Sequence, residues 1–111
     1  MDFNSHLMTQ FQYSSFRFPQ QEIIERSLGN HSVLALMPTG AGKSLTYQFV
    51  ASLAEKNELV LVVSPLIALM LDQSTRANEY KIESTFINSS LSLEQKQSRM
   101  QQIAEGKYSL I

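Results

Sequence analysis

The feature that most constrains the fold of this chain is a short glycine-containing segment, Met37-Pro38-Thr39-Gly40-Ala41-Gly42-Lys43-Ser44. Gly40 and Gly42 allow backbone conformations and close approaches that a Cβ atom would prevent. The backbone N–H groups of such a loop can turn inward around phosphate oxygens. The Lys43 ammonium then reaches the outer phosphates, and the Ser44 hydroxyl is placed to bind Mg²⁺. The segment therefore predicts a loop that grips the polyphosphate of a nucleotide.

The residues on either side of this loop have the patterns of a strand and of a helix. Val33–Met37 is a continuous apolar run, which is typical of a buried parallel strand. After the loop, apolar residues recur at helical spacing: Leu45, Phe49, Val50, Leu53 and Ala54. We expect a strand over about Ser32–Met37 and a helix from the loop to about Lys56. The alternative is an ordinary turn between a strand and a helix, which the Gly-Lys-Ser ending disfavours.

The rest of the chain alternates between helical and extended patterns. Helices are expected over about Asn4–Gln10, over Gln20–Leu28 with Gly29 at the end, after Ser64-Pro65, and after Ser92, where Gln95 completes a capping box. The last helix should bury Leu93, Met100, Ile103 and Ala104. Further strands are expected over Leu59–Val63, Ser84–Asn88 and Tyr108–Ile111.

This alternation predicts an α/β protein with the three-layer fold of P-loop NTPases, in which helices cover both faces of a parallel sheet. Ligands bind such sheets at the carboxyl ends of the strands. The loops Pro38–Lys43, Ser64–Leu66 and Asn88–Leu91 each follow an expected strand. They should therefore lie on one rim of the sheet, and function should be found there.

Composition limits the classes of function. With 111 residues, of which 43% are hydrophobic, the chain can form one domain with a buried core. The net charge is −1, so composition itself gives no support for nucleic-acid binding. The absence of cysteine excludes disulfides and cysteine-ligated metals. We expect no membrane association, because no apolar run approaches the ~20 residues of a membrane span. The N-terminus also lacks the pattern of a secretion signal.

No acidic residue of the chain follows an apolar strand where nucleotide hydrolysis needs one. Such an acid helps to hold Mg²⁺ beside the phosphate-binding loop. The acidic residues after Ser44 fall on expected helices or turns: Glu55, Glu58, Asp72, Glu79, Glu83, Glu94 and Glu105. We therefore expect the catalytic acid to lie beyond Ile111, and the sequence to be a truncated part of a larger enzyme.

Segments spread over roughly Phe11 to Ile111 resemble the RecQ-type DNA helicases of superfamily two. They are Phe11-Gln12-Tyr13-Ser14-Ser15-Phe16-Arg17-Phe18-Pro19-Gln20, the phosphate-binding loop, Val63-Ser64-Pro65-Leu66-Ile67-Ala68-Leu69-Met70-Leu71-Asp72-Gln73, and Asn88-Ser89-Ser90-Leu91-Ser92. Their order is also that of the family. The sequence departs from the family at Gln12 and at Ala41, where glycine is usual or frequent, and Met37 replaces the first glycine of the general loop pattern.

The resemblance implies a RecA-like motor domain that uses ATP and Mg²⁺ to unwind DNA in the 3′-to-5′ direction. Lys43 and Ser44 would be the catalytic residues, with Ser44 on the metal. The adenine site would comprise Tyr13, Arg17 and Gln20, next to a loop of Pro38, Thr39, Gly40, Ala41, Gly42, Lys43 and Ser44. DNA contacts would come from Ser64, Pro65, Leu66, Ser89 and Ser90. Structural alternatives stay open: the aromatic residues near Tyr13 could plug a sheet edge, and the serines could simply cap helices.

The implied organisation is the N-terminal part of a helicase ATP-binding domain over residues 1–111. Residues 1–31 would form the adenine-recognition segment and its helix, and residues 32–111 the strand, the loop and the following βα units. Single-stranded or duplex DNA and a second RecA-like domain would be the partners, in the bacterial cytoplasm (nucleoid) or in the nucleus. Two alternatives compete with this hypothesis. One is a stand-alone nucleotide-binding module or small nucleotide kinase, and the other is an inactive remnant.

Overall fold

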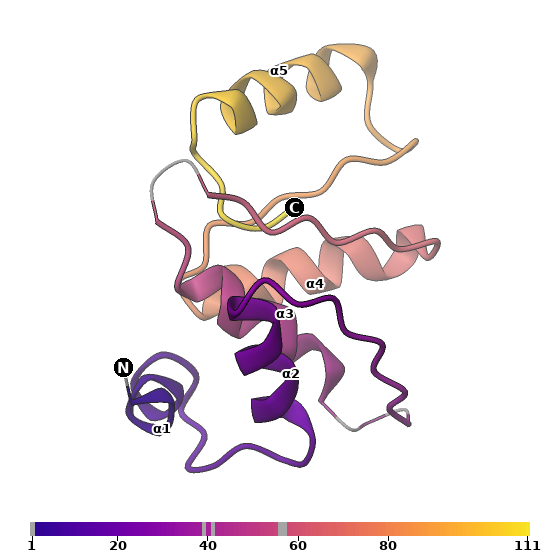
Figure 1. Ribbon diagram of the computed structural model, residues 1–111. Helices are drawn as coiled ribbons and strands as arrows, with labels where there is room; N and C mark the ends of the chain where they lie inside the picture. The colour runs from indigo at the N-terminus through magenta and orange to yellow at the C-terminus, as the bar shows by residue number, and fades with distance from the viewer. Residues whose placement is uncertain (1, 39, 41, 56–57) are drawn as a thin grey trace. The chain divides into compact units, whose positions relative to one another are not determined.

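The computed structural model describes residues 2–38, 40, 42–55 and 58–111, which fall into two compact units that divide between Leu53 and Ala54. The first unit contains the helices α1 (Phe3–His6), α2 (Gln20–Leu28) and α3 (Lys43–Ser52), and a π-helical turn, η1 (Leu7–Phe11), that follows α1 directly (Figure 1). The second unit contains α4 (Ile67–Glu79) and α5 (Leu93–Ala104). Among the described residues, no helix has both the length and the hydropathy needed to cross a bilayer.

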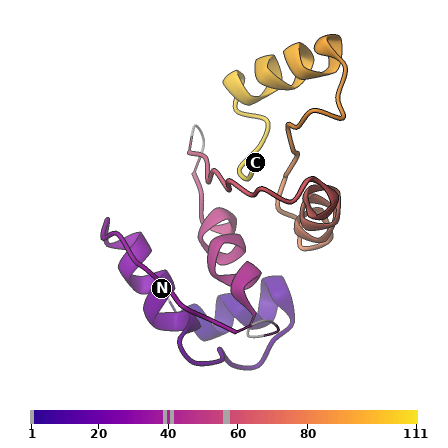
Figure 2. The ribbon, with the colours of Figure 1, turned by 90° about the vertical axis from the view of Figure 1, so that its right-hand side faces the viewer.

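The core of the first unit is built around Phe49 of α3, which is fully buried. Four aromatic rings surround it, with centroids 5.1 to 5.9 Å from its own: Phe3, His6, Phe11 and Phe16. On another side, α2 packs against α3, and Ile24 of α2 has no exposed surface (Figures 1 and 2). The core therefore joins the N-terminal turns to the helix that follows the glycine-containing loop.

The helices of this unit largely follow the sequence predictions. Helix α2 has the predicted bounds, with Gly29 at its C-terminal end. Helix α3 starts directly after the loop but ends at Ser52, before the predicted Lys56, which lies outside the described residues. In its last turn the Ser52 hydroxyl donates to the carbonyl of Phe49, at 2.6 Å, and the N–H of Leu53 donates to that of Val50, at 3.1 Å. These i→i+3 bonds tighten the last turn and end the helix.

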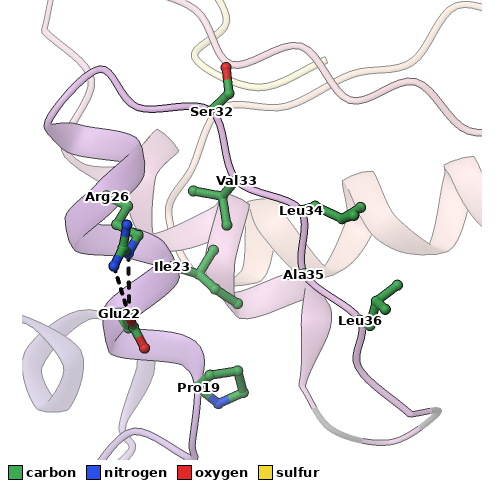
Figure 3. Close-up of a pocket in the computed structure, with 9 residues that line it drawn as sticks. All are labelled: Pro19, Glu22, Ile23, Arg26, Ser32, Val33, Leu34, Ala35 and Leu36. Carbon is green, nitrogen blue, oxygen red and sulfur yellow. Dashed lines mark hydrogen bonds and ion pairs between the residues drawn. The ribbon is translucent and has the colours of Figure 1, made fainter.

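The segment predicted as the first strand, Ser32–Met37, is extended but is not a buried strand. Within the described residues, its backbone forms no hydrogen bond. The side chain of Val33 points toward Ile23 of α2, whereas Leu34 and Leu36 point away from that helix (Figure 3). These two leucines are 87% and 88% exposed. The prediction of a buried strand is wrong here because burial requires pairing and covering layers. Among the described residues of the first unit, the segment faces α2 across a hollow of about 350 Å³.

The second unit contains two β-pairings among its described residues, both of them isolated parallel bridges at Leu110. Leu110 pairs with Val60 on one side and with Ser84 on the other, so the C-terminal segment lies between the other two (Figure 2). The hydrogen bond from the Ile111 N–H to the Val60 carbonyl, at 3.0 Å, belongs to the first pairing. The predicted strands over Leu59–Val63, Ser84–Asn88 and Tyr108–Ile111 are thus reduced to single bridges. Their parallel direction agrees with the prediction.

Helix α4 differs from the prediction in its start, and α5 differs in its inner face. Helix α4 begins at Ile67, and Ser64 does not cap it; its hydroxyl instead accepts the N–H of Leu66, at 3.2 Å, in a local turn. Helix α5 begins with the predicted capping box of Ser92 and Gln95.

The predicted inner face of α5 is wrong, because Leu93, Met100 and Ala104 are exposed and Ile103 is only half-buried. Arg99 lies on the inner side instead. It donates to the Phe86 carbonyl, at 2.7 Å, and its guanidinium lies 4.7 Å from the centroid of the Phe86 ring. The helix is therefore oriented by this polar and cation–π contact rather than by its apolar residues.

Candidate nucleotide-binding site

The glycine-containing loop adopts a conformation that its glycines make possible. Gly40 and Gly42 have φ angles of +83° and +80°, in the left-handed region that side chains disfavour. Helix α3 starts at Lys43, so the loop leads directly into the N-terminus of a ten-residue helix. The first N–H groups of a helix have no intrahelical partner and are suited to bind an anion. The predicted loop residues Thr39 and Ala41 lie outside the described residues.

The side chains of this loop are available for the predicted chemistry. Lys43 and Pro38 are exposed, and Ser44 is half-buried at the second position of α3. Within the described residues, no group of three or more histidine or acidic residues could hold a metal ion. Mg²⁺ commonly uses one or two protein ligands together with phosphate oxygens. A single hydroxyl at Ser44 fits that mode of binding.

Gln20, the first residue of α2, connects the predicted adenine segment to the loop. Its Oε1 accepts the backbone N–H of Arg17, at 2.7 Å, and its Nε2 donates to the carbonyl of Gly42, at 2.9 Å. The residue is only 3% exposed. A Cβ atom added to Gly42 would collide with this Nε2 atom. Glycine is therefore required at position 42 both by its backbone angles and by the neighbouring glutamine.

Arg17 contacts the same loop at Gly40, two residues before Gly42. Its Nη1 donates to the carbonyl of Gly40, at 3.0 Å. The structure thus brings together two of the three predicted adenine residues, Arg17 and Gln20, on the outer side of the loop. The third, Tyr13, lies in the preceding irregular segment with 47% of its surface exposed.

The hydrogen bonds of Gln20 also determine how its amide is oriented. A glutamine amide offers two N–H donors and two carbonyl lone pairs. Because one end accepts from Arg17 and the other donates to Gly42, the two ends are distinguished, and one donor and one acceptor are left. That remaining pair matches the donor and acceptor on the edge of an adenine base.

The predicted DNA-contacting residues all belong to the second unit. Ser64 is half-buried, and Pro65 and Leu66 are exposed ahead of α4. Ser89 and Ser90 are exposed in a turn that Asn88 organises, since its Oδ1 accepts both the N–H and the hydroxyl of Ser90. The Nδ2 atom of Asn88 lies 3.5 Å from the sulfur of Met70, in the second turn of α4. Both groups of predicted contacts therefore flank the N-terminal part of α4.

Sequence reasoning missed two features of these sites. The carbonyl groups of Gly40 and Gly42 act as acceptors, which no side-chain pattern encodes. Asn88 organises its turn, and the signal for this was present, because asparagine two residues before a serine is typical of such turns. The predicted common rim is not tested, because its loops belong to different units.

Comparisons with known proteins define the class of this chain. Residues 17–111 match the family model described as DEAD/DEAH box helicase. Because this match covers most of the sequence, the chain belongs to the DEAD/DEAH box helicase family.

Its similar proteins are RecQ-type helicases. The chain is 42% identical over 107 residues to the "ATP-dependent DNA helicase RecQ" of Haemophilus influenzae. The corresponding protein of Synechocystis is 36% identical over 99 residues, and the "ATP-dependent DNA helicase Q5" of Rattus norvegicus is 39% identical over 105 residues. These alignments cover 96%, 89% and 93% of the chain but only 17%, 20% and 11% of the respective relatives. The chain therefore spans a fifth or less of the length of these relatives.

Proposed function

We propose that this chain is the nucleotide-binding part of an ATP-dependent DNA helicase of RecQ type. The observation that carries the proposal is the double link of Arg17 and Gln20 to the carbonyl groups of the loop before Lys43. This link joins a segment suited to bind a base with a loop suited to bind phosphates. The names of the similar proteins, which are ATP-dependent DNA helicases from bacteria and a mammal, support the same function.

In the proposed mechanism, the chain's own groups hold and orient the triphosphate. The N–H groups at the start of α3 and the Lys43 ammonium bind the outer phosphate oxygens, and Lys43 stabilises the negative charge that develops during transfer of the terminal phosphate. Mg²⁺, when bound, neutralises charge on the phosphates. Ser44 contributes a hydroxyl ligand to that ion. Tyr13 stacks on the adenine, and Arg17 and Gln20 fix the base relative to the loop.

DNA is proposed to bind the second unit at the start of α4 and at the Asn88 turn. Helix starts and small hydroxyl side chains are common contacts for DNA phosphates. The described contacts of Asn88 with Ser90 and with Met70 support a shared surface for Ser64–Leu66 and Ser89–Ser90. These groups would contact the backbone rather than the bases, which suits a motor that tracks along single strands. The 3′-to-5′ direction follows from the resemblance to RecQ-type helicases.

The proposed fold of the whole motor domain is the RecA-like three-layer arrangement with a parallel sheet. Two parallel bridges at Leu110 support a sheet in which the C-terminal segment is central. Residues 1–31 would then be the adenine-recognition part and residues 32–111 the phosphate-binding and DNA-facing part. A second RecA-like domain would complete the nucleotide site, in the compartment that holds the DNA.

An equilibrium titration tests the nucleotide specificity of this proposal. The 111-residue protein is titrated with Mg·ATP, Mg·GTP, a nucleoside monophosphate and a thymidine oligomer. Binding of ATP in preference to GTP is expected, because the remaining donor and acceptor of Gln20 match adenine and not guanine. Equal binding of both triphosphates would support a general phosphate-binding module. Tight binding of a nucleoside monophosphate would favour a small nucleotide kinase.

A second experiment tests the motor function. A longer version of the protein, which carries a catalytic acid and a second RecA-like domain, is assayed for ATP hydrolysis with and without single-stranded DNA. Lys43→Ala is expected to abolish hydrolysis that DNA stimulates, since the lysine stabilises the transferring phosphate. If the variant keeps DNA-stimulated hydrolysis, the helicase assignment is wrong.

A further inference from the structure

We propose that Arg17 and Gln20 form a clip that sets the phosphate-binding loop for a triphosphate, independently of any contact with the base. The inference rests on the proposed function and assigns these two residues a positioning role beyond base recognition. The Arg17–Gln20 clip consists of three hydrogen bonds: the Arg17 guanidinium donates to the Gly40 carbonyl, the Gln20 amide donates to the Gly42 carbonyl, and the Arg17 N–H donates to the Gln20 side-chain oxygen.

The peptide between Gly42 and Lys43 shows how the clip acts on the anion site. In a trans peptide the C=O and the N–H point in opposite directions. Because the Gly42 carbonyl points to the Nε2 atom of Gln20, 2.9 Å away, the N–H of Lys43 points to the other side of the loop. That N–H is the first donor of α3 and has no intrahelical partner. The hydrogen bond from Gln20 to the Gly42 carbonyl therefore orients the N–H of Lys43 toward the side of the loop where the phosphates are proposed to bind.

The central residue of the clip, Gln20, is buried and makes two hydrogen bonds. Gln20 is 3% exposed, and a buried amide that loses a partner loses a hydrogen bond that water does not replace. Arg17 participates through both its main chain and its side chain, so the segment 17–20 and the loop 40–42 are held at two points. A donor array that is fixed before the ligand arrives avoids part of the ordering entropy of binding.

A ligand that has no base distinguishes the two possible roles of Arg17 and Gln20, base recognition and positioning of the loop. Inorganic tripolyphosphate carries the same phosphate chain as ATP, so the clip should affect its binding, whereas a pure adenine contact should not. The 111-residue protein and its variants are titrated by calorimetry with tripolyphosphate in Mg²⁺ and, in parallel, with Mg·ATP. Gln20→Glu keeps an oxygen for the Arg17 N–H but replaces the donor to Gly42 with a second oxygen.

The clip predicts that Gln20→Glu weakens tripolyphosphate binding by about five-fold, the effect of one lost hydrogen bond, and weakens ATP binding at least as much. Gln21→Ala is the matched control, because Gln21 is the next residue of α2 and its exposed amide bonds only to Glu25 on the helix surface. This control should bind both ligands as the unchanged protein does. Gln20→Ala removes both bonds of the amide without adding a negative charge. It should also weaken tripolyphosphate binding, which excludes repulsion by the new carboxylate of Gln20→Glu as the only cause.

A general loss of stability must be distinguished from a positioning effect. Phe49 makes none of the three clip bonds, so Phe49→Leu shows how far binding falls when the core is loosened and the melting temperature falls. Each variant is titrated at the same number of degrees below its own melting temperature. Under these conditions, the clip predicts that Gln20→Glu binds tripolyphosphate more weakly than Phe49→Leu does. Equal binding by the two variants would overturn the inference.

Failure of the inference can be told apart from failure of the proposed function. If the unchanged protein binds neither tripolyphosphate nor ATP, the proposed function fails. If it binds both, and Gln20→Glu weakens ATP binding but leaves tripolyphosphate binding at the level of Gln21→Ala, then Gln20 acts only on the base and the clip is wrong.

Discussion

Gly40 and Gly42 provide a matched pair of substitutions that measures how tightly the loop is held. Both residues have φ angles near +80°, so alanine at either position carries the same backbone strain, roughly 1 kcal/mol. They differ in their surroundings. A Cβ on Gly40 meets no atom within 4 Å, whereas a Cβ on Gly42 collides with the Gln20 amide nitrogen.

The collision sets the expected difference between the two variants. The Gln20 amide is the end of a flexible side chain and can move, but it is buried and would lose its bond to the Gly42 carbonyl. One such bond contributes about 1 kcal/mol. Gly40→Ala should therefore lower the free energy of unfolding by about 1 kcal/mol, and Gly42→Ala by about 2 kcal/mol.

Urea unfolding followed by far-ultraviolet circular dichroism measures both values. In a background that carries Gln20→Ala, where the collision and the bond are both absent, Gly42→Ala should cost only the backbone strain, about 1 kcal/mol. Equal losses for the two single variants in the unchanged background would refute the reasoning, because Gln20 would then not be in contact with Gly42 in solution.

Three further predictions concern the cores of the two units. Phe49→Ala should remove about 3–5 kcal/mol of stability, measured by urea unfolding, whereas Leu34→Ala should change it by less than about 0.5 kcal/mol, since Leu34 is 87% exposed; similar losses would contradict the described core. Burial lowers the pKa of His6 below its ordinary value of 6.5, so protonation favours the unfolded chain and stability should fall as the pH decreases below about 6.5. His6→Gln should flatten this dependence of the melting temperature on pH, and an unchanged slope would exclude the histidine as its cause. Arg99→Ala should destabilise the second unit by about 1–2 kcal/mol, because the guanidinium bonds the Phe86 carbonyl and covers its ring; a loss no larger than that of an exposed arginine would show the contact to be absent.

The helices could be predicted from the sequence because their signals are local. The Gly29 end of α2 and the Ser92–Gln95 capping box of α5 involve residues within one or two turns of each other, so short stretches of sequence determine them. The sequence predicts that α4 starts directly after Ser64-Pro65, but the helix starts at Ile67. The Ser64 hydroxyl instead accepts a local hydrogen bond from the Leu66 N–H. Sequence pattern alone does not decide between such neighbouring hydrogen-bonding choices.

The strands could not be predicted with the same success, because their hydrogen bonds come from segments that are distant in the sequence. The apolar runs at Val33–Met37 and Leu59–Val63 predicted buried strands, yet Leu36 and Val63 are each 88% exposed. An apolar run shows that a segment is suited to burial but not that the covering layers are present. In the part of the chain that the structure describes, Leu110 has two parallel partners, Val60 and Ser84, and each pairing is a single bridge.

For the candidate site, the sequence predicted which segments matter but not how they are joined. The motif pattern identified the loop and the adenine segment, and the structure links them through main-chain carbonyls that no motif specifies. In the structure the Gln20 amide is bonded to Arg17 and Gly42, and its contact with a base stays a prediction. The sequence does not specify these partners, because a glutamine side chain can make up to four hydrogen bonds with different groups.

The central claim is that the loop before α3 grips a triphosphate, and a crystal structure of the protein with a non-hydrolysable ATP analogue and Mg²⁺ tests it most directly. The account predicts the outer phosphates within hydrogen-bonding distance of the Lys43 ammonium and of the first N–H groups of α3, with the Ser44 hydroxyl on the metal. A loop that stays empty at saturating analogue, or a Lys43 side chain that extends into solvent beside a bound nucleotide, would contradict it.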